Sequence, residues 1–156
     1  MAEFKPKTVY VTYIAAPPEK VWRALTSPEF TRKYFWDRTV ELEPKVGGAF
    51  ALRLPDGRVN VQGKVVEYDP PRKLSVTWQV LWPEEFSKLP ACLVAYEIVR
   101  AGKPTRLTMT ESHSWEVPEA ILSGGRMGWP AILSSLKSLL ETGESLAETR
   151  TWPKGV

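Results

Sequence analysis

The chain has 156 residues, a length typical of a single domain with one sizeable core, which we expect to extend over residues 1–156. One cysteine and one histidine exclude both an internal disulfide and a zinc site made of four Cys and His ligands. The formal net charge is +3, and the basic residues are dispersed in ones and twos near turns, which argues against a nucleic-acid-binding protein.

The N-terminal part of the sequence predicts one strand followed by two short helices. Residues 8–16 are rich in β-branched and aromatic residues at period two and stop at a pair of prolines, which predicts a strand. Apolar residues then follow helical spacing over 18–35, where a Ser-Pro pair interrupts the pattern. We therefore expect two helices with a break between them.

From Arg38 onward the hydrophobic period changes to two and stays so for about eighty residues, which predicts strands. The six predicted strands are RTVELEP, GAFALRL, NVQGKVVEYD, KLSVTWQVLW, ACLVAYEIVR and TRLTMTESHSWE. Their connections are short, whereas parallel neighbours need crossovers of about a dozen residues or more, so we expect a mostly antiparallel meander.

The stretch GGRMGWPAILSSLKSLLETGE at 124–144 predicts a long amphipathic helix with a glycine-rich start. From Trp129 onward the apolar residues share one helical face, and Gly143 is placed as the C-terminal cap. We expect the helix to begin near Trp129, with Pro130 in its first turn and the three preceding glycines allowing close backbone approach or leaving empty volume. A flexible loop ahead of the helix is the alternative.

Four segments in this order resemble one known superfamily. They are PPEKVWRALTSPE (17–29), VGGAFAL (46–52), GKVVEYDPPRKLSVTW (63–78) and GWPAILSSLKSLLETG (128–143). They resemble the START, polyketide-cyclase and birch-pollen-allergen-like (SRPBCC) superfamily, and within it the branch of heat-shock ATPase activator homologues. The resemblance covers about 8–144 and leaves the tail 145–156 outside.

The resemblance implies an α+β helix-grip fold. In that fold a curved antiparallel sheet wraps around a long C-terminal helix, and the elements follow in the order strand, two helices, six strands, helix. It also implies a cavity between sheet and helix, which in many relatives holds an apolar small molecule.

The last predicted strand carries the residues with acid–base chemistry. Its alternation places Met109, Glu111 and His113 on the same face as Leu107. If this face meets the long helix, the buried carboxylate and imidazole need a partner: a core polar group, water or a ligand. The alternatives to a ligand site are that both residues pair with core polar groups, or that the strand leaves the sheet before His113 and the imidazole is solvated. Both residues are candidates for ligand binding and for catalysis, and we expect no metal site.

Aromatic residues at the ends of elements provide the second signal for a pocket. Trp78 shares a strand face with apolar residues, and the others lie where predicted elements begin or end. We expect a cavity lined by Trp78, Met109, Glu111, His113 and Trp129, with Phe35, Trp36 and Trp82 near its mouth and Trp115 beside it; core packing is the alternative.

Three functions follow from these observations and from the resemblance. The first is a binding protein for an apolar small molecule, with no cofactor. The second is a cyclase-like or dehydratase-like enzyme that uses Glu111 and His113. The third is a stress-response protein that activates a chaperone ATPase, with the chaperone or a second copy of the chain as its partner.

The sequence predicts a cytoplasmic protein that does not enter the membrane. The N-terminus has no apolar run of signal-peptide length, and no later stretch approaches the ~20 apolar residues that cross a bilayer.

Overall fold

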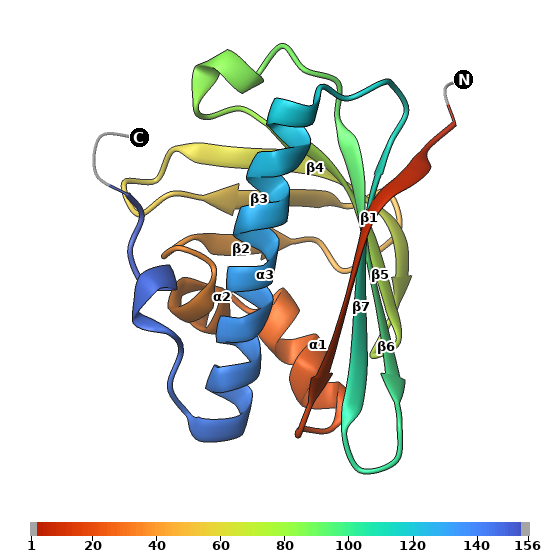
Figure 1. Ribbon diagram of the computed structural model, residues 1–156, viewed down its shortest axis with the longest axis vertical. Coiled ribbons are helices and arrows are strands. Elements are labelled where there is room, and N and C mark those ends of the chain that lie inside the picture. The colour runs from red at the N-terminus through yellow and green to blue at the C-terminus, as the bar shows by residue number, and fades with distance from the viewer. Residues whose placement is uncertain (1–2, 154–156) are drawn as a thin grey trace.

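The computed structural model describes residues 3–153 and shows a curved antiparallel sheet that wraps around a long helix (Figure 1). The strands are β1 (Lys5–Ile14), β2 (Thr39–Leu42), β3 (Ala49–Arg53), β4 (Val59–Asp69), β5 (Lys73–Val80), β6 (Cys92–Arg100) and β7 (Thr105–His113). The helices are α1 (Pro18–Thr26), α2 (Pro28–Tyr34) and α3 (Glu119–Thr142), with short 3-10 turns η1 (Glu84–Phe86) and η2 (Ala147–Thr149). The predicted α+β helix-grip architecture is confirmed. Among the described residues, no helix has the length and apolar content that a bilayer crossing requires.

The sheet has the strand order β1-β7-β6-β5-β4-β3-β2, so the first strand closes the meander beside the last one. Register shifts interrupt the pairing of β1 with β7, of β3 with β4 and of β4 with β5. Such bulges bend a sheet and increase its twist. At Gly63 the backbone of β4 approaches β5 so closely that a Cβ atom would lie 1.8 Å from the Thr77 carbonyl oxygen. The glycine therefore permits the tight bend of the sheet around the helix.

The long helix begins ten residues before Trp129, so the predicted start was wrong. Pro118 is the N-cap residue, with φ −57° and ψ 142°, and its carbonyl accepts hydrogen bonds from the backbone N–H groups of Ile121 and Leu122. The glycine-rich stretch therefore belongs to the helix itself, and Pro130 lies inside it. Packing of the apolar face offsets the ~0.5–1 kcal/mol that each glycine costs in a helix and the hydrogen bond that the proline lacks. The predicted C-cap, Gly143, is left-handed as expected, with φ 86°.

The core lies between the concave face of the sheet and the three helices. Its fully buried side chains include Ile14 of β1, Val21 of α1, Leu107 and Met109 of β7, and Leu136 of α3. The break between α1 and α2 falls at Ser27, whose backbone is extended because a proline follows it. The start of α3 and the β5–β6 connection that carries η1 lie at the same end of the molecule (Figure 1).

We predict that Leu136→Ala lowers the free energy of unfolding by about 2–5 kcal/mol, because Leu136 is fully buried on the face of α3 that meets the sheet. Met127→Ala is the matched control on the same helix, since Met127 is 78% exposed. It should change stability by at most about 0.5 kcal/mol. Urea denaturation followed by circular dichroism measures both values. A loss for Leu136→Ala as small as that of the control would contradict the assignment of this face to the core.

Candidate functional site

Glu111 and His113 lie on the concave face of β7, as the alternation of the strand predicted. Their side chains are 12% and 7% exposed, and His113 Nε2 lies 2.8 Å from Glu111 Oε1. The imidazole nitrogen Nδ1 is buried and has no hydrogen-bond partner among the described residues. The two side chains thus use only part of their hydrogen-bonding capacity on each other, and His113 Nδ1 can still bind a further partner.

The pair borders a small hollow of about 180 Å³ at the start of α3, which we call the His113 hollow. Its lining comes from β5, β6, β7, α3 and the β5–β6 connection: Trp78, Gln79, Val80, Phe86, Leu89, Pro90, Cys92, Glu111, His113, Trp115, Ile121 and Trp129. The Gln79 side-chain amide donates to backbone carbonyls of the connection and is satisfied. Trp115 Nε1 is buried and has no hydrogen-bond partner in the part of the chain that the structure describes. The hollow is therefore apolar, with unsatisfied polar atoms at His113 and Trp115.

A second hollow of about 360 Å³ shares Trp78 and Trp129 with the first, and we call it the Arg38 hollow. It is lined by Phe35, Trp36, Arg38, Trp78, Gly128, Trp129, Ile132, Trp152 and Pro153. Gly128 leaves open space, since a Cβ atom built there would meet nothing within 4 Å. The glycines of α3, which were expected to leave volume beside the helix, do so at this position.

Trp78 and Trp129 are shared by the two hollows, because each of them lines both, and we call this pair the tryptophan wall. Their ring centroids are 5.4 Å apart with an interplanar angle of 54°. Phe35 packs against both rings, with its centroid 5.6 Å from that of Trp129 and 6.3 Å from that of Trp78. Aromatic pairs at these separations add about 0.5–1.5 kcal/mol each beyond the area that they bury. These three rings therefore connect β5, α3 and the end of α2, and the two tryptophans line both hollows.

The structure distributes the predicted site residues over these features. Glu111, His113 and Trp115 line the His113 hollow, Phe35 and Trp36 line the Arg38 hollow, and Trp78 and Trp129 line both. Two predicted residues line neither hollow. Met109 is fully buried in the core, and the Trp82 ring lies under the Arg58 guanidinium at 4.2 Å.

Arg38 is the main residue that sequence reasoning missed. It is 8% exposed, and it lies directly before β2 in a turn where a charged residue is usually solvated. Trp36 and Asp37 ahead of it both have positive φ angles, 59° and 57°, in the left-handed region that only a few per cent of non-glycine residues adopt. Trp152 comes from the tail, where neither periodicity nor the resemblance gave a signal.

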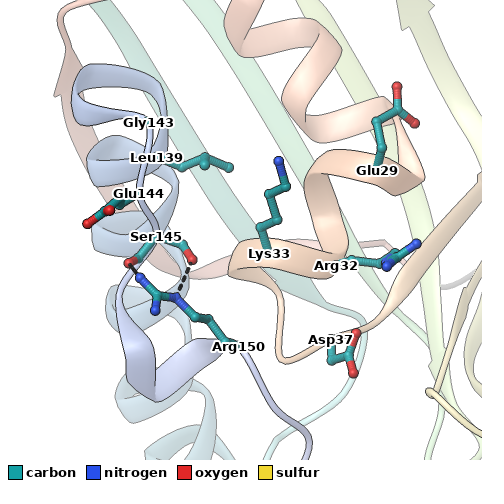
Figure 2. Close-up of a pocket in the computed structure, with 9 residues that line it drawn as sticks. All are labelled: Glu29, Arg32, Lys33, Asp37, Leu139, Gly143, Glu144, Ser145 and Arg150. Carbon is teal, nitrogen blue, oxygen red and sulfur yellow. Dashed lines mark hydrogen bonds between the residues drawn. The ribbon is translucent and has the colours of Figure 1, made fainter.

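A larger hollow of about 560 Å³ lies between α2 and the C-terminal end of α3, and Figure 2 shows its lining. Its charged side chains are mixed in sign: Glu29, Asp37 and Glu144 against Arg32, Lys33 and Arg150. Arg150 donates to the Ser145 hydroxyl and backbone carbonyl. Its described lining has one large apolar side chain, Leu139, and no buried unsatisfied group, so this charged groove is a weaker candidate than the two hollows around Trp129.

Comparison with known proteins identifies the family. Residues 15–141 match the family model described as Activator of Hsp90 ATPase homolog 1-like protein. No curated protein matches the sequence. Similar solved structures include the protein MLL2253 from Mesorhizobium loti, with 29% identity, a TM-score of 0.70, and coverage of 85% of this chain and 95% of that one.

Two further structures share the fold at lower identity. The Aha1 dimer from Colwellia psychrerythraea has 21% identity and a TM-score of 0.70 and covers 88% of this chain and 97% of its own. CalU16 from Micromonospora echinospora has 22% identity and a TM-score of 0.70, and the alignment covers 96% of this chain and 88% of CalU16. At such identities the likeness establishes the fold alone.

Cys92 lines the His113 hollow, and we predict that its thiol is unreactive in the folded protein. Burial, and secondarily the Glu111 carboxylate, raise the pKa of Cys92 to about 12. Near pH 8 the thiolate fraction is then roughly a thousandfold lower than for a free cysteine. Reaction with a chromogenic disulfide should be slower by a similar factor than in the guanidinium-unfolded chain. Equal rates for the folded and unfolded protein would contradict the buried placement.

Proposed function

The chain belongs to the Activator of Hsp90 ATPase homolog 1-like family, and we propose that it binds a small hydrophobic molecule against the wall formed by Trp78 and Trp129. One observation carries the proposal: the same pair of packed tryptophans lines two hollows. Ligand sites are typically apolar concavities of about 300–1,000 Å³ with a few polar groups that fix orientation. The Arg38 hollow lies in this range, and the smaller His113 hollow adjoins it at the wall.

Apolar contact should supply most of the affinity, at ~25 cal/mol per Å² buried, less the cost of immobilising the ligand. The polar atoms of the His113 hollow would then set orientation. When Nε2 of His113 carries the proton and donates to Glu111, Nδ1 is an acceptor, while Trp115 Nε1 is a donor. A hydroxyl group on an apolar body can satisfy both requirements, since it donates one hydrogen bond and accepts others.

An acid–base enzyme is the second candidate, and the hydrogen bond between Glu111 and His113 beside a hollow favours it. A carboxylate that orients an imidazole is a common arrangement for moving a proton to or from a bound molecule. No nucleophile accompanies the pair on the hollow's lining except the buried thiol of Cys92. Proton transfer is therefore the chemistry that the pair could perform.

The third function expected from the sequence, activation of a chaperone ATPase, is supported by the family description and by a similar fold in an HSP90 activator from Plasmodium falciparum. A homodimer is supported only by the dimeric state given for the Colwellia protein.

We predict that wild-type protein binds N-phenylnaphthylamine, an uncharged fluorescent probe, and that Gly128→Phe weakens this binding at least about tenfold. The added ring has room to extend into the Arg38 hollow, where it would occupy the volume needed by an aromatic ligand. Gly128→Ala is the matched control because it adds one methyl group and favours the helix by up to about 1 kcal/mol. Fluorescence titration gives both affinities, and thermal unfolding verifies that the variants are folded. Equal affinities for the two variants would contradict the proposed site.

Glu111→Gln separates the binding protein from the enzyme. For a binding protein, naphthol should bind about 3- to 10-fold more weakly, because without the carboxylate the tautomer that leaves His113 Nδ1 as an acceptor is no longer favoured, and a hydrogen bond is worth about 0.5–1.5 kcal/mol. Methylnaphthalene should bind unchanged. For an enzyme, the same variant should lose turnover of its substrate while binding persists. Glu97→Gln, at an exposed position of β6, makes the same chemical change away from the hollows and is the control. Equal loss of affinity for both ligands would contradict an orienting role of Glu111.

A further inference from the structure

Arg38 is a buried cation on the wall of an otherwise apolar hollow. It is 8% exposed, and its guanidinium carbon lies 4.6 Å from the ring centroid of Phe35 and 5.3 Å from that of Trp152. Its Nε atom donates to the Phe35 carbonyl at 3.0 Å, and Nη1 donates to the Asn60 side-chain oxygen. Asn60 is itself held by a hydrogen bond from its amide nitrogen to the Trp82 carbonyl. The guanidinium is thus fixed in one orientation by neutral groups.

No carboxylate neutralises this charge within residues 3–153. The salt bridges among the described residues leave Arg38 out. Its neighbour Asp37 is the nearest carboxylate in the sequence, but the Asp37 side chain lines the charged groove instead (Figure 2). Nη2 makes no hydrogen bond to the described residues. Burial lowers the pKa of Arg38 to about 9, so the group still carries its charge at neutral pH.

The backbone holds Arg38 in this position against its local preference. The two left-handed residues, Trp36 and Asp37, turn the chain so that Arg38 enters the protein instead of solvent. The Trp36 N–H donates to the Thr149 carbonyl at 2.8 Å, which ties this turn to the tail that carries Trp152. Uncommon backbone conformations of this kind cluster at binding and active sites, where the surrounding structure sustains them.

We infer that the Arg38 hollow receives the carboxylate of an aromatic acid, with the ring against Trp78 and Trp129 and the carboxylate on the free donors of Arg38. A guanidinium presents a planar pair of donors that matches a carboxylate, and here one edge of it is available. A phosphate would need more donors than this largely apolar lining offers. The inference rests on the proposed function, since it specifies the class of molecule that the hydrophobic site would take.

The test compares naphthoate with its uncharged amide, naphthamide, by isothermal titration calorimetry. Wild-type protein should bind naphthoate about 10- to 100-fold more tightly, because hydrogen bonds to charged groups are worth about twice those between neutral ones. Arg38→Gln should reduce this preference to within about twofold, and Arg38→Lys should keep part of it because the charge remains without the planar fork. Arg72→Gln is the control: it makes the same charge change at an exposed residue of the β4–β5 turn and should keep the full preference.

The outcomes separate the two proposals. If wild-type protein binds neither compound, the hydrophobic binding function is refuted, and this inference is refuted with it. If both compounds bind with equal affinity, the binding function stands and the role of Arg38 is refuted. A preference for naphthoate that survives in Arg38→Gln would also refute it, because the anion would then lie elsewhere. If the Arg38 variants fail to fold, equal binding of the two compounds by wild-type protein still refutes the role of Arg38.

Discussion

The contact between Trp78 of β5 and Trp129 of α3 determines how the sheet and the long helix meet. It joins residues 51 positions apart in the sequence, and Phe35 of the α2 C-terminus completes the cluster. Trp78 and Trp129 each line both hollows, and Phe35 lines the Arg38 hollow as well. The same rings therefore stabilise this end of the core and also form part of the lining of the two hollows.

The polar groups around this wall are too few to form a network and too buried to be solvated. Glu111 and His113 pair with each other, Arg38 is held by an amide and a carbonyl, and the buried Trp115 nitrogen has no partner within residues 3–153. Leaving such groups unsatisfied costs free energy in an isolated protein. A ligand that pairs with them would regain that free energy, which is why polar atoms in an apolar surrounding confer orientation and selectivity at little cost in affinity.

The strands and the inward placement of Glu111 and His113 could be predicted because both depend on a local period of two, which the meander preserves from Arg38 to the end of β7. The start of α3 could not, since Pro130 and the glycines are unfavourable for a helix when considered alone and are tolerated only through contacts with distant strands. The burial of Arg38 was missed for a similar reason. It depends on two left-handed residues and on Asn60 from another strand, and no spacing rule relates these.

The most direct test of this account uses the indole N–H signals of the seven tryptophans, which report on separate parts of the molecule. Proton–nitrogen correlation spectra should be recorded during titration with naphthoate. We predict that the indole signals of Trp78 and Trp129 shift most, whereas that of Trp22, which packs against Tyr68 on another part of the core, stays in place. Shifts at Trp22 that equal or exceed those at Trp78 and Trp129 would contradict the account, and so would a complete absence of shifts.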